Sequence, residues 1–444
     1  MDQPEDVEVI LTSKHRYNLH SNVLARNSPF FADLLIEANA AKLAPRTLAT
    51  GKYTRWMFQL RKLPNDDYPA GQLALLKLNH KAEPINATHI FTLNENGKEP
   101  TKFFEHYESL LYAFYGKDLA ISNTDMMCAL QDAISILQIA EYLGCVNVIS
   151  KPIDAAFFKH GQVLFRAIQT NPRHWADLAL KIKSEMMFKE AIVHLSGSWN
   201  AISYTNKATL GAEIRAVCEK HHNLLMRKRQ RVESLLASTY PGNMAAPSDF
   251  RPVKREDYAK DILVWMALGF FRHWFAQQVI MGSGAHSPDG GFALYSRVAK
   301  GGDAYMDKDV MGQFNKKFPV TKKAMNVLEN HLAEMKIGFQ DLVQKQRVLD
   351  SNCQLDVHRY PVPYLTCVEL DREDYPWLRE LVGGEDPVPE KRPGGNQIVQ
   401  ENLAAARRYA GEMIAESSGK RGRETGDDQV ELDLAAAYGK KRQK

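Results

Sequence analysis

The sequence has little of what marks a secreted or membrane-spanning protein. Its five cysteines form no C-x-x-C pair, and the start of the chain has no apolar stretch like that of a signal peptide. We therefore expect reduced thiols in an intracellular protein. The most apolar window, 262–280, is interrupted by Arg272, His273 and two glutamines, which would be costly in a bilayer. It predicts a buried core helix and no membrane contact.

The sequence also lacks a strong excess of charge and the motifs of common catalytic sites. A net charge of +4 over 444 residues gives no general case for nucleic-acid binding. The run Gly282-Ser283-Gly284 is not the G-x-S-x-G elbow of hydrolases, and 300–303 (KGGD) does not fit a P-loop. We therefore expect no enzymatic activity, no cofactor and no direct nucleic-acid contact.

Two groups of cysteine and histidine are candidates for metal ligands. Cys218 lies three and four residues before His221 and His222, a spacing that can place ligands on one helix face. A partner cluster is not apparent, and Cys353 and Cys367 lack ordinary zinc spacing. Structural or solvated roles are favoured, so the sequence predicts no metal site.

The most definite pattern of the chain lies between Asp6 and Leu35. Alternating apolar residues at 7–11 predict a strand, and 16–19 a second extended run. From Val23 onward the apolar spacing changes to three and four, which is the helical period. Ser28-Pro29 is typical of a helix start, with an N-cap hydroxyl followed by proline.

In order, spacing and residue type, this stretch resembles the opening of a BTB (POZ) domain. The matching positions are Asp6, Val9, Tyr17, His20, Val23, Leu24, Ala25, Ser28 and Phe31. The resemblance resumes at Tyr115-Gly116 and at Gly144-Cys145, so it spans roughly residues 5–150. Two features depart from the family: Ser21 follows the histidine in place of a basic residue, and 40–85 looks like an inserted hairpin.

The resemblance implies a small sheet clasped by helices and usually a pairing between two copies. It also implies a structural role for His20 and, as one option, work as a substrate adaptor on a cullin scaffold. A first strand that starts near residue 7 disfavours a dimer built on a long swapped N-terminal helix. A homodimer of another kind and a monomer both stay open.

The predicted fold class is therefore α+β, with a BTB-like domain followed by a mostly helical region. We expect a helical extension at 151–240, a C-terminal helical domain at 257–381 and a disordered tail at 383–444. Within 257–381, the Gly-rich stretch 282–319 predicts a long irregular loop. The heptad spacing of 325–349 favours a core-facing helix over a coiled coil.

Two further predictions concern strands and a contact surface. Alternation at 55–63 predicts a half-buried strand, and 73–78 its return strand. Trp56 and Phe58 are the first candidates for an interaction surface if they are exposed. The prolines and aromatics of 350–381 predict an ordered cap without helices, and with one short strand at 364–370.

Basic residues gather in three places. Arg227-Lys228-Arg229-x-Arg231 predicts the solvated face of a helix. Two clusters in the tail, about sixteen residues apart, resemble a bipartite nuclear import signal. They consist of Lys420, Arg421 and Arg423, and of Lys440, Lys441, Arg442 and Lys444. The alternative is a tail that only increases solubility.

Together these observations predict a non-enzymatic protein–protein interaction protein. It would be a scaffold or adaptor that pairs through residues 5–150 and presents a helical body to protein partners. The alternatives are a substrate adaptor of a cullin-type ubiquitin ligase and a nuclear transcription co-regulator that acts through partners. An enzyme would need a site within 257–381. The nucleus is slightly favoured over the cytoplasm.

Removal of residues 420–444 tests the import signal. If both basic clusters are read by an import receptor, the shortened protein loses nuclear accumulation, because the exposed positive charges are gone. Fluorescence microscopy of tagged full-length and shortened chains measures this. An unchanged nuclear fraction would leave the tail with a solubilising role.

Overall fold

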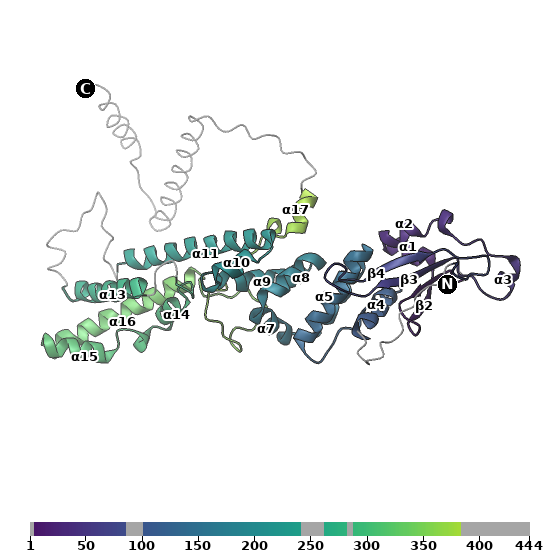
Figure 1. The fold of residues 1–444 in the computed structure, drawn as a ribbon. Coiled ribbons are helices and arrows are strands. Elements are labelled where there is room, and N and C mark those ends of the chain that lie inside the picture. The colour runs from purple at the N-terminus through teal and green to yellow at the C-terminus, as the bar shows by residue number, and fades with distance from the viewer. Residues whose placement is uncertain (1–3, 86–100, 241–261, 282–286, 383–444) are drawn as a thin grey trace, which may run out of the picture. The chain divides into compact units, whose positions relative to one another are not determined.

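Four short strands form one mixed sheet near the N-terminus of the computed structural model, which describes residues 4–85, 101–240, 262–281 and 287–382 (Figure 1). The order across the sheet is β2-β1-β3-β4. β1 is antiparallel to β2 and parallel to β3, and β3 is antiparallel to β4. The strands are β1 (Val7–Ile10), β2 (Arg16–Leu19), β3 (Trp56–Lys62) and β4 (Gln72–Leu76). The predicted α+β class is confirmed.

The hairpin predicted within 40–85 is confirmed, because β3 and β4 correspond to the strands predicted at 55–63 and 73–78 and pair antiparallel, and its being an insertion stays a prediction. β3 lies in the middle of the sheet, where Phe58 pairs with both Val9 and Leu75. Because β3 is covered on both faces, Met57 and Gln59 are as buried as the apolar residues with which they alternate. The alternation of apolar and polar residues at 55–63 therefore did not indicate a strand with one exposed face. Removing this segment would remove two of the four strands.

The hypothesis of a contact surface at Trp56 and Phe58 is also corrected. Trp56 is 3% exposed, and its indole N–H donates to the carbonyl oxygen of Ile36 at 3.3 Å. Phe58 is fully buried and meets the ring of Phe31 edge to face, with the centroids 5.1 Å apart. Both side chains belong to the core, because a central strand has no solvent face here.

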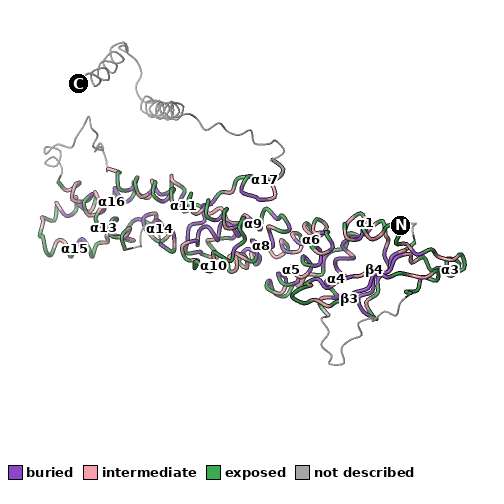
Figure 2. The backbone as a smooth tube through the Cα atoms, turned by 45° about the horizontal axis from the view of Figure 1, so that its top comes forward, coloured by how far each residue is buried: buried purple, intermediate pink, exposed green. Residues whose placement is uncertain are grey.

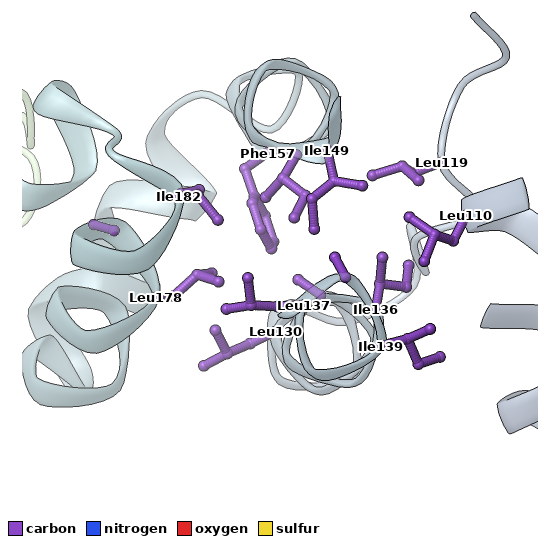
Figure 3. Close-up of a cluster of buried hydrophobic side chains, with 14 of the residues drawn as sticks. Leu110, Leu119, Leu130, Ile136, Leu137, Ile139, Ile149, Phe157, Leu178 and Ile182 are labelled. Carbon is purple, nitrogen blue, oxygen red and sulfur yellow. The ribbon is translucent and has the colours of Figure 1, made fainter. Parts of the chain in front are cut away.

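Helices cover the sheet and continue as a packed body. They are α1 (Ser21–Asn27), α2 (Pro29–Leu34), η1 (Glu37–Asn39), α3 (Pro45–Ala49), α4 (Thr101–Ala113), α5 (Met126–Leu143), α6 (Val146–Phe158), α7 (Gln162–Thr170), α8 (Pro172–Ile182), α9 (Glu185–Gly197), η2 (Trp199–Ala201), α10 (Tyr204–Ala208) and α11 (Ala212–Ser238). Figure 3 shows apolar side chains meeting between them, among them Ile136, Phe157 and Leu178. This first core runs from the sheet into the helices.

A second core gathers the helices after α11. They are α13 (Ile262–Met281), α14 (Phe292–Lys300), η4 (Gly302–Ala304), α15 (Lys308–Lys317) and α16 (Lys322–Lys345). Phe271 of α13 stacks on Phe339 of α16, with ring centroids 3.8 Å apart. The predicted core-facing helix at 325–349 is thus found as α16. The irregular loop predicted for 282–319 is wrong, because α14, η4 and α15 occupy its described part.

Burial of α13 is partial, which corrects in part the prediction of a buried core helix at 262–280. Ala267, Leu268 and Phe275 point into the second core, whereas Ile262 and Ile280 are 56% and 76% exposed. The helix is apolar all round, so its sequence could not show which face would be covered. Among the described residues, no helix is long and apolar enough to cross a membrane.

The segment 350–370 joins the two cores without forming a helix or a strand. Leu355 and Tyr364 belong to the first core, and Leu365 and Val368 to the second. The predicted ordered cap is present, but the predicted strand at 364–370 is not. The prediction that 350–381 has no helices is wrong at its end, where η5 (Arg372–Asp374) and α17 (Pro376–Val382) lie. Figure 2 shows buried and exposed stretches along the backbone.

The chain divides into two units, Met1–Leu381 and Val382–Lys444. Residues 383–444 lie outside the described residues, as do 86–100 and 241–261. The first unit contains all three ranges that the sequence proposed as folded domains. Their boundaries within it stay a prediction.

Gly197 gives a test of how the segment 350–370, the cap segment, packs against α9. A Cβ at this helical position would lie 2.3 Å from the carbonyl oxygen of Leu365, so Gly197→Ala forces the segment away from α9. We expect the substitution to lower the free energy of unfolding by about 1–3 kcal/mol. Chemical denaturation followed by circular dichroism measures it.

The matched control is Gly338→Ala, also within a long helix. Apart from the helix's own nearby backbone, nothing lies within 4 Å of a Cβ there, so alanine should raise stability by about 0.4–1 kcal/mol through its better helix propensity. Equal effects of the two substitutions would contradict the close approach at Gly197.

A candidate partner-binding pocket between two C-terminal helices

A mostly apolar pocket of about 300 Å³ lies between α16 and the chain that leads from η4 into α15. Leu332, Ala333 and Ile337 line it from α16, and Met306 and Met311 from the opposite side. Its volume is at the lower end of the range of about 300–1,000 Å³ found for ligand pockets. Ile337 is 58% exposed, so the apolar lining on α16 reaches the protein surface.

Local sequence explains the wall opposite α16. Gly301 has φ +57° and ends α14, a backbone conformation that favours glycine. Asp307 then caps α15, because its carboxylate accepts a hydrogen bond from the Val310 N–H at 3.0 Å. Between them Met306 adopts φ +47°, which is uncommon for a residue with a side chain. The wall is therefore a short, constrained turn.

Lys336 of α16 holds this turn in place. Its ammonium donates to the carbonyl oxygens of Gly302 at 2.6 Å and Met306 at 3.0 Å. It also lies 5.1 Å from the centroid of the Tyr305 ring. Burial lowers the pKa of Lys336 below its usual value, and the charges of Asp303 and Asp307 oppose that shift in part. The lysine is a structural support of the pocket.

The rim of the pocket is acidic. Asp303, Asp307 and Glu329 line it, together with Lys308 and Lys336. Since the ammonium of Lys336 is turned toward backbone carbonyl oxygens, Lys308 is the one cation of the lining that can face a ligand. The arrangement suits an apolar side chain whose neighbours carry positive charge.

A second cavity of about 270 Å³ is lined by Arg229, Asp289 and Arg297, among others. Its carboxylate is already engaged, because Asp289 accepts hydrogen bonds from the N–H groups of Gly291 and Ala293, each at 2.9 Å, and from the Ser287 hydroxyl. Burial raises the pKa of Asp289, but these bonds outweigh it and hold the pKa below its usual range. This carboxylate shapes the start of α14.

The residues predicted to form a basic helix face do not act as one. Arg227 and Arg231 are exposed, but Arg229 is 2% exposed and pairs with Glu233 at 2.7 Å. The prediction of a solvated face is therefore wrong for Arg229. The seven basic residues of the predicted import signal lie outside the described residues, so that hypothesis stays a prediction.

Of the two cysteine–histidine groups, the one on α11 is drawn into separate contacts. Cys218 is buried in the first core, and the imidazole of His221 pairs with Asp374 at 2.9 Å. His222 meets the carbonyl oxygen of Ser196 at 3.3 Å. The structure does not bring these three side chains together as ligands.

Sequence reasoning missed the residues of the pocket. Lys336 stands next to the heptad position Met335, and nothing in the spacing distinguishes it from a solvated lysine. It also missed a buried pair on α9, Glu190 and His194. Their spacing of four residues places them on one helix face and was a usable signal.

A family model of the FF domain matches residues 241–345, which is less than half of the chain. The described part of the match contains α13 to α16 and therefore the pocket. No curated protein and no solved structure matches the chain. The FF domain is a protein–protein interaction module, which is compatible with the predicted non-enzymatic interaction protein.

The comparison with family models corrects the family that was assigned from the N-terminal residues. The family that the comparison supports is the FF domain, which differs from BTB, so the prediction of a BTB (POZ) domain is wrong. The homodimer and the cullin scaffold rested on that resemblance and are not supported. Protein partners in general are consistent with the match.

Lys336→Met tests the support of the pocket. The substitution leaves the carbonyl oxygens of Gly302 and Met306 without their donor, so we expect a loss of about 1–3 kcal/mol in the free energy of unfolding. Lys323→Met, at an exposed position of the same helix, should stay within about 0.5 kcal/mol of the unchanged protein. Equal stability of both variants would exclude the supporting role.

Proposed function

We propose that this protein binds a partner protein through the pocket between α15 and α16 and acts without catalysis of its own. The observation that carries the proposal is the coincidence of the pocket with the residues that match the FF domain. A module of that kind works by presenting a surface to another protein. The pocket is the described feature of that region best shaped to receive a side chain.

The chemistry of the lining specifies the partner. The lining is apolar at Met306, Met311 and Leu332 and would take a leucine, methionine or phenylalanine side chain. The carboxylates of Asp303, Asp307 and Glu329 at the rim favour lysine or arginine beside that anchor. We therefore propose a basic segment with one buried apolar residue as the bound element.

A constrained wall supports this role. Lys336 and the cap at Asp307 hold the turn around Met306 before any partner arrives. A site whose walls are already fixed loses less conformational entropy on binding. The proposal of a nuclear co-regulator is compatible with this mode of action, and the nuclear location stays a prediction.

Ala333→Phe tests the proposal. Ala333 is exposed and lines the pocket, so a phenylalanine there fills the space that the partner's side chain would occupy. Tagged full-length protein is used to capture partners from an extract of its source, and the captured proteins are quantified by mass spectrometry. We expect the partner to be lost by about tenfold or more, since a hot-spot contact exceeds about 2 kcal/mol.

The matched control is Ala276→Phe, the same change at an exposed position of α13 that does not line this pocket. It should retain the partner. If the unchanged protein, Ala333→Phe and Ala276→Phe all capture every protein equally well, the pocket is not the binding site. Thermal melting of each form shows that the variants are folded.

A further inference from the structure

Three potential metal ligands meet between α9 and the cap segment. Glu190 and His194 lie one turn apart on α9, and Cys353 comes from the cap, about 160 residues later in the chain. One ligand atom of each lies within 4.8 Å of the other two. We propose that these three side chains form a zinc-binding site that fastens the cap to α9. The site is separate from the proposed partner pocket.

The donor set suits zinc. One thiolate, one imidazole and one carboxylate are the three ligand types that Zn²⁺ uses in proteins. The carboxylate of Glu190 is 1% exposed and, apart from the imidazole of His194, is met by uncharged backbone donors. Zinc bound by a carboxylate, a thiolate and a neutral imidazole gives a site of zero net charge. That balance is favourable in a buried place.

The distances also fit. Nε2 of His194 and Oε1 of Glu190 are 3.3 Å apart, which is long for an N–H···O hydrogen bond. Two ligands on a tetrahedral zinc ion, with bonds of about 2.0–2.2 Å, are separated by about 3.3–3.5 Å. On such an ion the sulfur of Cys353 would lie about 3.6 Å from each of the other two ligand atoms. It lies within 4.8 Å of them here, so it would have to move closer by about 1.2 Å at most.

The groups around the ligands hold them as a metal site requires. The hydroxyl of Tyr364 lies 3.0 Å from Nδ1 of His194, so it can accept the Nδ1–H while Nε2 binds the ion. The Glu190 carboxylate accepts the N–H groups of Gln354 at 2.7 Å and Leu355 at 3.0 Å, and a lone pair is left for zinc. Both ligands are therefore oriented.

The thiol of Cys353 is the ligand that changes on binding. Zinc ligation requires the thiolate form of this side chain. Zinc binding replaces the S–H bond with a Zn–S bond and releases the proton to solvent. Cys353 is only partly covered, which gives the ion a route into the site.

Cobalt substitution tests the site in the full-length protein, prepared without a histidine tag and stripped of metal under reducing conditions. We expect one Co²⁺ per chain, with the absorption of a tetrahedral ion and a thiolate-to-cobalt charge-transfer band. Zn²⁺ should displace the cobalt. Cys353→Ser should abolish the charge-transfer band, and Cys128→Ser, a partly exposed cysteine of α5, should keep it.

Two further measurements separate metal binding from a purely structural network. Tyr364→Phe should weaken cobalt binding by about tenfold, because the ring loses the hydroxyl that orients His194. In the unsubstituted protein, Zn²⁺ should protect Cys353 from alkylation while Cys128 stays reactive. This measurement does not depend on whether any variant folds. Cobalt binding without a thiolate band, or no protection of Cys353, would overturn the site.

Discussion

The buried carboxylate of Glu190 is the contact on which the packing of the cap depends. The segment 350–370 has neither helix nor strand to satisfy its backbone, so side chains of other elements must do so. Glu190 accepts hydrogen bonds from the N–H groups of Gln354 and Leu355. The side-chain oxygen of Gln162 on α7 accepts one from the N–H of Asp356 at 2.8 Å. With these donors satisfied, the segment can lie buried between two cores.

A second buried carboxylate continues the same arrangement. Asp374 of η5 is 1% exposed and lies 2.5 Å from the ammonium of Lys220 and 2.9 Å from the imidazole of His221, both on α11. Burial raises the pKa of Asp374, but these partners and the Asp371 N–H outweigh it and hold the pKa below its usual value. Two carboxylates therefore fasten one stretch of chain to α9 and α11.

The partner pocket and the zinc site depend on different parts of the molecule. The pocket is made by α15, α16 and a turn that Lys336 supports, all within the second core. The zinc ligands lie where the cap meets α9. One feature would bind another protein and the other would stabilise the fold, and neither assigns a reaction to the chain.

Local sequence determined the elements whose signals are local. Ser28 and Asp125 cap α2 and α5, as hydroxyl and carboxyl groups before a helical run do. The spacing of 325–349 determined a core-facing helix. Tertiary structure decided which side chains other elements cover. β3 became a central strand, so Trp56 and Phe58 were buried, and one face of the uniformly apolar α13 stayed exposed. It also decided the meeting of Glu190 and His194 with Cys353, because sequence spacing does not record contacts between residues about 160 positions apart.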